Sequence, residues 1–266
     1  MSENLVFEKK EHIAYITMNR PERGNAINLE MYKLLQESFK RINDDDDIWV
    51  AIITGAGERT FCSGMDLKDV GGLLTSTERM GDLLTSGTAG FPIDDPFLLN
   101  MRSVKKPIIS AINGNVFAGG FILSLNSDIR IAVKDISFSI TEAKLGRGSP
   151  WAIPLVWMLP LGIVMELTLT GDPIPAERMY QLGLINRLVN REELMPTAVA
   201  IAERIRDNAP LSVKAAKESL LNAIDLGCKA GIDKAIEIYL PLYLSEDARE
   251  GPKAFIEKRK PVWRNK

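Results

Sequence analysis

The stretch Ile48-Trp49-Val50-Ala51-Ile52-Ile53-Thr54, stopped by Gly55-Ala56-Gly57, decides the fold class. An almost continuous apolar run predicts a strand buried on both faces, as in parallel sheets that helices cover. A similar run at 108–112 is its predicted partner. Further runs follow at 129–133 and around 136–140, and only some of the segments between the runs are long enough to form a helix. This spacing favours a superhelix of ββα units over a doubly wound sheet.

The rest of the chain divides into an opening hairpin with a helix and a helical end. Residues 6–8 and 12–18 are predicted to be paired strands, and Asn28 is the predicted N-cap of a helix at 29–42. The C-terminal third is predicted to be helical, with segments at 164–170, 175–182, 192–208, 211–226, 229–240 and 249–260. Residues 69–96 have weak periodicity and several turn residues, so we expect a poorly ordered or mobile segment there.

Composition bounds the class of protein. Of 266 residues, 45% are hydrophobic and 26% are charged, which is typical of a soluble globular protein with one sizeable core. The 33 basic and 35 acidic residues are interleaved, so we expect no nucleic-acid groove and no basic membrane face. The start MSENLVFEKK has neither a signal core nor an Arg-rich presequence, and the two cysteines lack metal-ligand spacing. We therefore expect a reduced, cytoplasmic protein.

The single histidine, His12, excludes several mechanisms. Ser-His-Asp and Cys-His catalysts need an imidazole, and a zinc site usually needs more than one. His12 begins an alternating run and is predicted to lie at the surface or at a strand end. The chemistry is therefore expected to come from carboxylates, backbone dipoles or both, with no metal site.

Two strand ends carry small residues that let backbone amides approach a ligand. The first is Phe61-Cys62-Ser63-Gly64-Met65-Asp66-Leu67-Lys68, and the second is Asn113-Gly114-Asn115-Val116-Phe117-Ala118-Gly119-Gly120, before an apolar helix predicted to begin near Phe121. Helix-start N–H groups carry about half a positive charge, so the second loop is able to bind a developing anion. Alternatively, Gly119-Gly120 only permits close packing, and spacing alone leaves both interpretations open.

Five motifs occur in a characteristic order along the chain. They are Phe61 to Lys68, Lys106-Pro107-Ile108-Ile109-Ser110-Ala111-Ile112-Asn113-Gly114, Ala118-Gly119-Gly120, Ser127-Asp128-Ile129-Arg130 and Leu169-Thr170-Gly171-Asp172. Together they resemble the crotonase (enoyl-CoA hydratase/isomerase) superfamily over nearly the whole chain. The resemblance implies an α/β fold, a crotonase-like ββα superhelix with a helical C-terminal trimerisation region. It assigns residues 1–195 to the core with the coenzyme A and active-site loops, and residues 196–266 to oligomerisation.

The same resemblance implies the ligand and the assembly. An acyl-CoA thioester is the expected substrate, with coenzyme A as part of it and no permanently bound cofactor. In the family, two backbone N–H groups polarise the thioester carbonyl and hold the enolate, and the matching residues are Met65 and Gly119. Relatives form trimers or pairs of trimers, so we expect a homo-oligomer.

Coenzyme A contacts are implied for two parts of the chain. Met65, Asp66, Leu67 and Lys68 resemble the wall that meets the adenine and pantetheine groups. Two further residues match positions that reach a neighbouring subunit's coenzyme A in relatives, namely Phe255 and Lys258. A solvated lysine on a basic helix is the alternative for Lys258.

The acid-base residues depart from the family's hydratases, which use two glutamates. The first position is occupied by Ile122, which neither takes nor gives a proton. The second is occupied by Glu142, within Phe138-Ser139-Ile140-Thr141-Glu142-Ala143-Lys144-Leu145-Gly146. Glu142 is therefore the candidate acid/base, with an ordinary solvated loop residue as the alternative.

The segment after Glu142 is also unusual. Gly146-Arg147-Gly148-Ser149-Pro150-Trp151 replaces the glycine-rich turn of typical hydratases, and Ile122, Arg147 and Trp151 are candidates for the acyl pocket. The alternatives are that Trp151 is simple core and that Arg147 is surface. Cys62 lacks an adjacent base, so we expect no nucleophilic role for it.

Three functional interpretations remain open. A single carboxylate beside an enolate-stabilising hole suffices to move a proton between two carbons, which favours double-bond isomerisation over hydration. Another enolate reaction, namely decarboxylation, thioester hydrolysis or carbon-carbon cleavage, is the second interpretation. A non-catalytic acyl-CoA-binding protein is the third.

Overall fold

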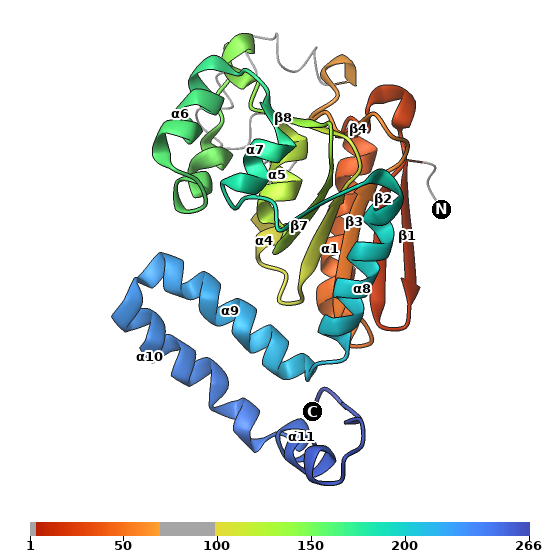
Figure 1. Ribbon diagram of the computed structural model, residues 1–266, viewed down its shortest axis with the longest axis vertical. Helices are drawn as coiled ribbons and strands as arrows, with labels where there is room; N and C mark the ends of the chain where they lie inside the picture. Colours follow the sequence, from red (N-terminus) through yellow and green to blue (C-terminus); the bar gives the residue numbers. More distant parts are fainter. Residues whose placement is uncertain (1–3, 70–98) are drawn as a thin grey trace.

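The structure is a computed structural model that describes residues 4–69 and 99–266. The segment 69–96, for which the sequence predicts mobility, lies outside these residues except for Asp69. Figure 1 shows a body of sheets and helices that contains the N-terminal half, from which three C-terminal helices extend. None of the described helices is both long and apolar enough to cross a membrane.

Two sheets form the body. The larger has the order β1-β2-β3-β5-β7-β10, in which only the β1–β2 pair is antiparallel. Its strands are β1 (Leu5–Lys10), β2 (Ile13–Met18), β3 (Val50–Gly55), β5 (Ile108–Ile112), β7 (Ile129–Val133) and β10 (Arg187–Val189). The smaller has the order β4-β6-β8-β9, with strands β4 (Thr60–Cys62), β6 (Asn115–Phe117), β8 (Ser137–Ser139) and β9 (Ile174–Pro175).

The connection between the sheets repeats along the chain. β3 is followed by β4, β5 by β6 and β7 by β8, so each repeat of the chain adds one strand to the larger sheet and one to the smaller sheet. This is the predicted ββα superhelix, and the predicted parallel pairing of β3 with β5 is confirmed. The predicted strand around 136–140 is β8, which belongs to the second sheet. The repeat brings the ends of β4, β6 and β8 side by side, because β4 pairs with β6 and β6 pairs with β8.

The helices begin and end close to the predicted positions. Asn28 caps α1 (Leu29–Asp44) by accepting a 2.8 Å hydrogen bond from the Met31 N–H. α5 begins two residues before the predicted Phe121. The other helices are α4 (Leu99–Arg102), α5 (Gly119–Asn126), α6 (Leu161–Thr170), α7 (Ala176–Gln181), α8 (Leu194–Arg206), α9 (Pro210–Leu226), α10 (Cys228–Tyr239) and α11 (Glu246–Ile256). Short 3₁₀ turns are η1 (Pro21–Arg23), η2 (Glu142–Leu145), η3 (Pro150–Trp157), η4 (Arg191–Glu193) and η5 (Pro241–Leu244).

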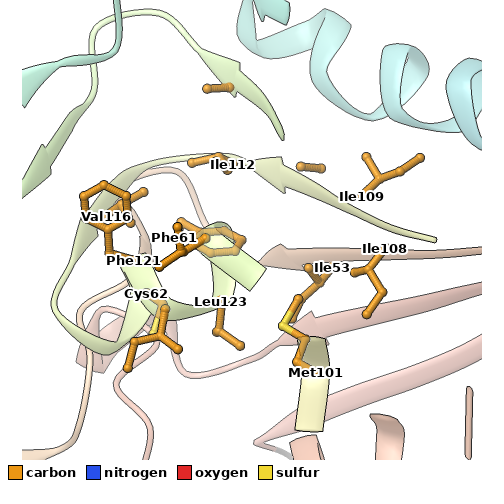
Figure 2. Close-up of a cluster of buried hydrophobic side chains, with 14 of the residues drawn as sticks. Ile53, Phe61, Cys62, Met101, Ile108, Ile109, Ile112, Val116, Phe121 and Leu123 are labelled. Atoms are coloured by element: carbon orange, nitrogen blue, oxygen red, sulfur yellow. The ribbon is translucent and has the colours of Figure 1, made fainter. Parts of the chain in front are cut away.

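The core lies between β3, β5 and the helices next to them. All of β5 is buried, and so are residues 50–53 of β3, as their continuous apolar runs predict. Figure 2 shows a cluster in which side chains of both sheets meet those of α4 and α5. Its labelled members are Ile53, Phe61, Cys62, Met101, Ile108, Ile109, Ile112, Val116, Phe121 and Leu123. The helix that follows Gly119 is therefore anchored by its own apolar side chains.

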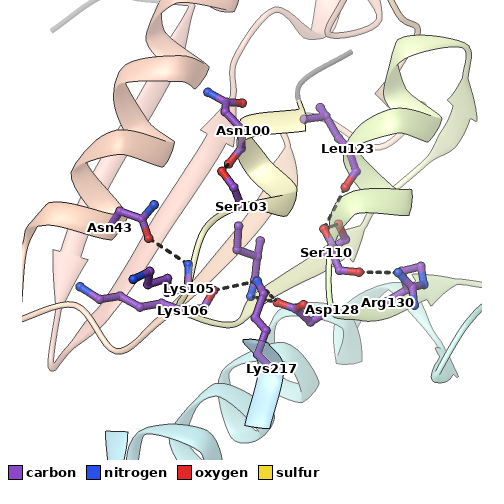
Figure 3. A network of polar contacts seen from close by, with 12 residues as sticks. Asn43, Asn100, Ser103, Lys105, Lys106, Ser110, Leu123, Asp128, Arg130 and Lys217 are labelled. Carbon is purple, nitrogen blue, oxygen red and sulfur yellow. Dashed lines mark hydrogen bonds and ion pairs between the residues drawn. The ribbon is translucent and has the colours of Figure 1, made fainter. Parts of the chain in front are cut away.

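The C-terminal helices attach to the body at two places. α8 packs on β3, β5 and β7, so the helices that extend from the body begin at α9. At α9, the Lys217 ammonium lies 2.7 Å from the Asp128 carboxylate and donates to the Lys106 carbonyl, as Figure 3 shows. Asp128 also accepts from the Ile108 N–H at 2.7 Å. The division into 1–195 and 196–266 stays a prediction.

Candidate active site

The first strand end places the amide of Met65. Residues 24–27 run beside the loop, where Ile27 and Met65 form a parallel bridge. In this bridge the Ile27 N–H donates to the Gly64 carbonyl at 2.7 Å, and the Ile27 carbonyl accepts from the Asp66 N–H at 2.9 Å. In a bridge of this kind the N–H of Met65 points away from the partner strand. Gly64 has a φ of +91°, a conformation that favours glycine.

The second strand end places the amide of Gly119. Gly119 is the first residue of α5, where N–H groups have no partner within the helix. The preceding Ala118 has φ +47° and ψ −119°, a disfavoured conformation for a residue with a side chain. Ala118 is held there by its N–H bond to the Ser139 carbonyl of β8, at 3.2 Å. The strained residue thus turns the backbone sharply from β6 into α5.

The two amides lie next to each other. A Cβ added to Gly64 would stand 2.9 Å from the Gly119 nitrogen, and one added to Gly119 would stand 3.5 Å from the Met65 nitrogen. One step further, a Cβ on Gly120 would stand 2.1 Å from the Cys62 carbonyl oxygen. Backbone therefore packs directly on backbone here. The arrangement brings two N–H donors to one place, as the stabilisation of an oxyanion requires.

Glu142 is the acidic residue that the structure brings to this region. Glu142 is the first residue of η2, which begins shortly after the end of β8. β8 pairs with β6, the strand that leads into Ala118. The Glu142 carbonyl accepts from the Arg147 N–H at 2.9 Å, which closes the turn. One carboxylate oxygen, Oε2, is buried and has no hydrogen-bond partner among the described residues. Glu142 is thus half-buried with one oxygen shielded from solvent, and its role as acid/base stays a prediction.

The ionisation of Glu142 is set by two opposing effects. Burial raises the pKa of the carboxyl above its ordinary value of 4.5, and this effect is larger than the others. Hydrogen bonds from its own backbone N–H and from the Trp151 side chain lower the pKa in part. A carboxylate whose pKa is raised is a stronger base than an ordinary carboxylate, which suits proton removal from carbon.

The two apolar candidates for the acyl pocket are buried around α5. Trp151 is only 6% exposed and packs on Phe121 with ring centroids 6.2 Å apart. Ile122 is buried in α5 directly after Phe121. The sequence left Trp151 as a pocket residue or as core; it is part of the buried core, and its place in an acyl pocket stays a prediction. Arg147 is partly buried and bonds Glu142 through its backbone.

Within the predicted coenzyme A wall, residues 65–68, the side chain of Asp66 stabilises the loop itself. The Asp66 carboxylate lies 3.0 Å from the Arg20 guanidinium and accepts from the Lys68 N–H at 3.2 Å. Burial tends to raise the pKa of Asp66, but Arg20 and the backbone N–H groups outweigh it and lower the pKa. Asp66 thus caps the turn, whereas Leu67 and Lys68 are exposed. Their contact with coenzyme A stays a prediction.

Three further predicted residues lie apart from the site or are inert. Phe255 of α11 is 85% exposed, and α11 lies at the end of the molecule away from β4 and α5 (Figure 1). Lys258 follows α11 and is also exposed. Within one chain neither residue joins Glu142 and Gly119. Burial raises the pKa of Cys62 to about 12, so the thiol is protonated and its predicted lack of a nucleophilic role is supported.

The part of the chain that the structure describes contains no group of three or more His, Cys, Asp or Glu placed to hold a metal ion. His12 lies at the turn between β1 and β2, where its ring stacks on Trp49 with centroids 4.1 Å apart. It contacts the Asp47 carboxylate at 2.9 Å. The prediction of a surface histidine at a strand end is confirmed.

Comparison with known proteins decides the family. A family model described as enoyl-CoA hydratase/isomerase matches residues 8–266. The chain belongs to this family. It is therefore an enzyme of the enoyl-CoA hydratase/isomerase type, and the resemblance to the crotonase superfamily is confirmed. A curated relative, the carnitinyl-CoA dehydratase of Salmonella enteritidis, is 36% identical over 272 aligned positions that cover 100% of both chains.

Solved structures of this family have the same fold. An enoyl-CoA hydratase from Bacillus anthracis matches with a TM-score of 0.88 and 31% identity, over 99% of this chain and 100% of that one. An enoyl-CoA hydratase from Mycobacterium tuberculosis matches with a TM-score of 0.87 and 33% identity, over 100% of both chains. The α/β fold of this enoyl-CoA hydratase/isomerase family member is thus as predicted.

The space between Gly64 and Gly119 is tested by adding one methyl group. In Gly64→Ala the new Cβ stands between the two amides, so we expect the rate with an acyl-CoA substrate to fall on the order of 100- to 1,000-fold, as when one oxyanion donor is lost. Gly183→Ala is the matched control, because Gly183 has a φ of +88° and no atom within 4 Å of the added Cβ. Equal losses of activity in both variants would contradict the assignment.

The buried carboxylate of Glu142 is tested by calorimetry. Because the pKa is raised on folding, the folded chain binds the proton more tightly, and stability falls as pH rises from 4.5 through the raised pKa. Glu142→Gln is therefore expected to melt at a higher temperature than the wild type at pH 8, and to lose this advantage as the pH falls toward 4.5. Glu166→Gln, at an exposed position on α6, is the control. Equal melting temperatures of Glu142→Gln and wild type at pH 8 would contradict the desolvated carboxylate.

Proposed function

We propose that the chain isomerises the double bond of an enoyl-CoA thioester, with a single glutamate as acid and base. Glu142 is half-buried with one unpartnered oxygen among the described residues, and the first acid position is occupied by Ile122; this combination carries the proposal. Removing a proton and returning it elsewhere requires one such group. Adding water requires that the water also be oriented, and Ile122 contributes nothing to that.

The catalytic steps use groups on both strand ends. Glu142 takes a proton from C2 of a 3-enoyl thioester, where the resulting charge spreads onto the thioester oxygen. The Met65 and Gly119 N–H groups hold this oxygen as the enolate forms. The protonated Glu142 then returns the proton to C4, and the double bond moves to the 2 position. No atom is gained or lost, so no cofactor is consumed.

The raised pKa of Glu142 supports this cycle. A carboxylate of ordinary pKa is a weak base toward a carbon acid, and its protonated form is scarce at neutral pH. Burial raises the pKa of Glu142 and so strengthens its carboxylate as a base; the proton that it returns to C4 is the one taken from C2.

Dehydration or hydration is the second candidate function. It is supported by the full-length similarity, at 36% identity, to a protein named carnitinyl-CoA dehydratase. In this version Glu142 would be the only carboxylate acting on both the water and the α-carbon proton. The acyl group of that relative is a candidate for the acyl group here.

Coenzyme A recognition, assembly and location belong to the same proposal. We assign the coenzyme A wall to Met65, Asp66, Leu67 and Lys68, with Phe255 and Lys258 reaching the ligand of a neighbouring subunit. A homotrimer or pair of trimers is supported by exposed apolar side chains on α9 and α10, which include Leu220, Ile224, Ile232 and Ile236. A cytoplasmic location is proposed on the sequence alone.

Isotope exchange separates the candidate reactions. Purified protein is incubated with 3-enoyl-CoA and with 2-enoyl-CoA in deuterated water, and the mass and deuterium content of the products are followed. We expect double-bond migration with deuterium at C2 or C4 and no added water. In Glu142→Gln the rate should fall on the order of 100- to 10,000-fold, as general acid-base catalysis predicts.

The control for this experiment is Glu166→Gln, because α6 packs against η2 and Glu166 is exposed. It should retain wild-type turnover. A mass gain of one water would favour hydration instead. Binding of the thioesters without proton exchange would favour a non-catalytic protein, and loss of carbon dioxide or free coenzyme A would favour another enolate reaction. Full activity of Glu142→Gln would overturn the assignment of the base.

A further inference from the structure

The C-terminal end of α5 is in contact with a buried positive charge. Arg130 of β7 is only 8% exposed, and its Nη1 donates to the carbonyls of Ser124 at 3.1 Å and Ser127 at 2.5 Å. Its Nε donates to the Leu184 carbonyl at 2.7 Å. The guanidinium therefore lies against the last turn of the helix whose first residue is Gly119.

The backbone of Arg130 is held as firmly as its side chain. The Arg130 N–H donates to the side-chain oxygen of Asn186 at 2.8 Å, and the Asn186 N–H donates to the Arg130 carbonyl at 2.8 Å. β7 lies between β5 and β10 in the larger sheet. The end of α5 is thus tied to an inner strand of the body.

The charge of Arg130 is balanced by backbone dipoles. The three hydrogen bonds from its guanidinium to described residues all end on carbonyls. The nearby carboxylate of Asp128 lies 2.7 Å from the Lys217 ammonium, with which it is paired (Figure 3). Burial lowers the pKa of Arg130 and Asp128 raises it in part, and arginine stays charged at every working pH. A buried charge in this state depends on the dipoles around it.

This charge reverses the sign of the charge at the C-terminal end of α5. The helix dipole places about half a negative charge at this end and about half a positive charge at the end that begins with Gly119. With the guanidinium of Arg130 bound, the C-terminal end carries a net charge of about half a positive unit. An anion that forms beside the Gly119 N–H is therefore attracted by both ends of the helix.

The helix is short enough for this effect to change a rate. The eight residues of α5 correspond to about 12 Å, and all of them are buried, so protein and not water fills the space. A unit charge about 12 Å from an oxyanion, at an effective dielectric constant of about 20, changes the rate about tenfold. Loss of one direct N–H donor costs on the order of 100- to 1,000-fold. Arg130 therefore supplements the two amides and does not replace them.

We propose that Arg130 is a positioning residue of the oxyanion hole, which acts on the enolate through α5. It fixes the C-terminal end of the helix and places a positive charge behind the Gly119 N–H. The inference rests on the proposed function, in which the Met65 and Gly119 N–H groups hold the thioester oxygen. It deepens that function, because a charge at this place favours the enolate over the neutral thioester and so acts mainly on kcat.

Replacement of Arg130 by citrulline tests the proposal, because citrulline keeps the shape of arginine and loses only its charge. Its Nε–H and ureido NH2 keep the donors to Leu184 and to the two carbonyls at the end of α5. We expect kcat to fall about 3- to 10-fold with little change in KM. The melting temperature should not fall, because a buried charge is removed while its hydrogen bonds stay. A structural role alone predicts the reverse, a lower melting temperature with unchanged kcat.

Two comparisons sharpen the experiment. Arg187→citrulline is the matched control, because Arg187 also donates to a carbonyl, that of Asn186 at 2.7 Å, but is exposed on β10; it should behave as wild type. Arg130→Lys and Arg130→Gln form a second pair, in which both variants lose the guanidinium fork and only the lysine keeps the charge. Arg130→Lys should therefore keep kcat closer to that of the wild type.

A readout without turnover separates this inference from the proposed function. The carbon-13 resonance of a bound saturated acyl-CoA, labelled at the thioester carbonyl, should move upfield of its wild-type position in Arg130→citrulline and Arg130→Gln, and stay unchanged in Arg187→citrulline. These shifts without double-bond migration would reject the proposed reaction and keep the role of Arg130. A wild-type resonance and kcat in Arg130→citrulline, or equal values in Arg130→Lys and Arg130→Gln, would overturn that role.

Discussion

Backbone-to-backbone contact between the end of β4 and the start of α5 is the constraint on which the site depends. Gly64 approaches the Gly119 nitrogen, and Gly120 lies against the Cys62 carbonyl, so neither place admits a side chain. The contact follows from the superhelix, because β4 and β6 are neighbours in the second sheet and end side by side. In the proposed function, two amides held on separate loops bind one oxygen without reorganisation, which is what makes fixed dipoles effective in catalysis.

This arrangement costs stability in at least two places. Ala118 holds a backbone conformation whose strain is on the order of 1–3 kcal/mol, and Glu142 buries an oxygen without a partner. Both costs occur beside the hole and are tolerated because the surrounding core is dense, as the cluster in Figure 2 shows. Stability and function are thus opposed at the same few residues, as is common at catalytic sites.

Much of the fold and part of the site could be predicted from sequence. The runs at 108–112 and 129–133 are β5 and β7 with unchanged bounds, because mostly apolar runs of this length suit strands that are buried on both faces. Strands as short as β4 and β6 have no readable period, and the helix start at Gly119 was missed because glycine disfavours helices. The packing of Trp151 on Phe121 depends on how η3 returns to the body, so its residue type alone left core and pocket as alternatives.

Polarisation of the thioester carbonyl is the central claim, and carbon-13 NMR tests it most directly. An acyl-CoA that lacks a double bond, labelled at the thioester carbonyl carbon, binds without reacting further, so its chemical shift reports the hydrogen bonds to the oxygen. The account predicts that this resonance moves downfield on binding to the wild type and to Glu142→Gln alike, because both keep the Met65 and Gly119 amides. A bound carbonyl with the chemical shift of the free thioester would contradict it.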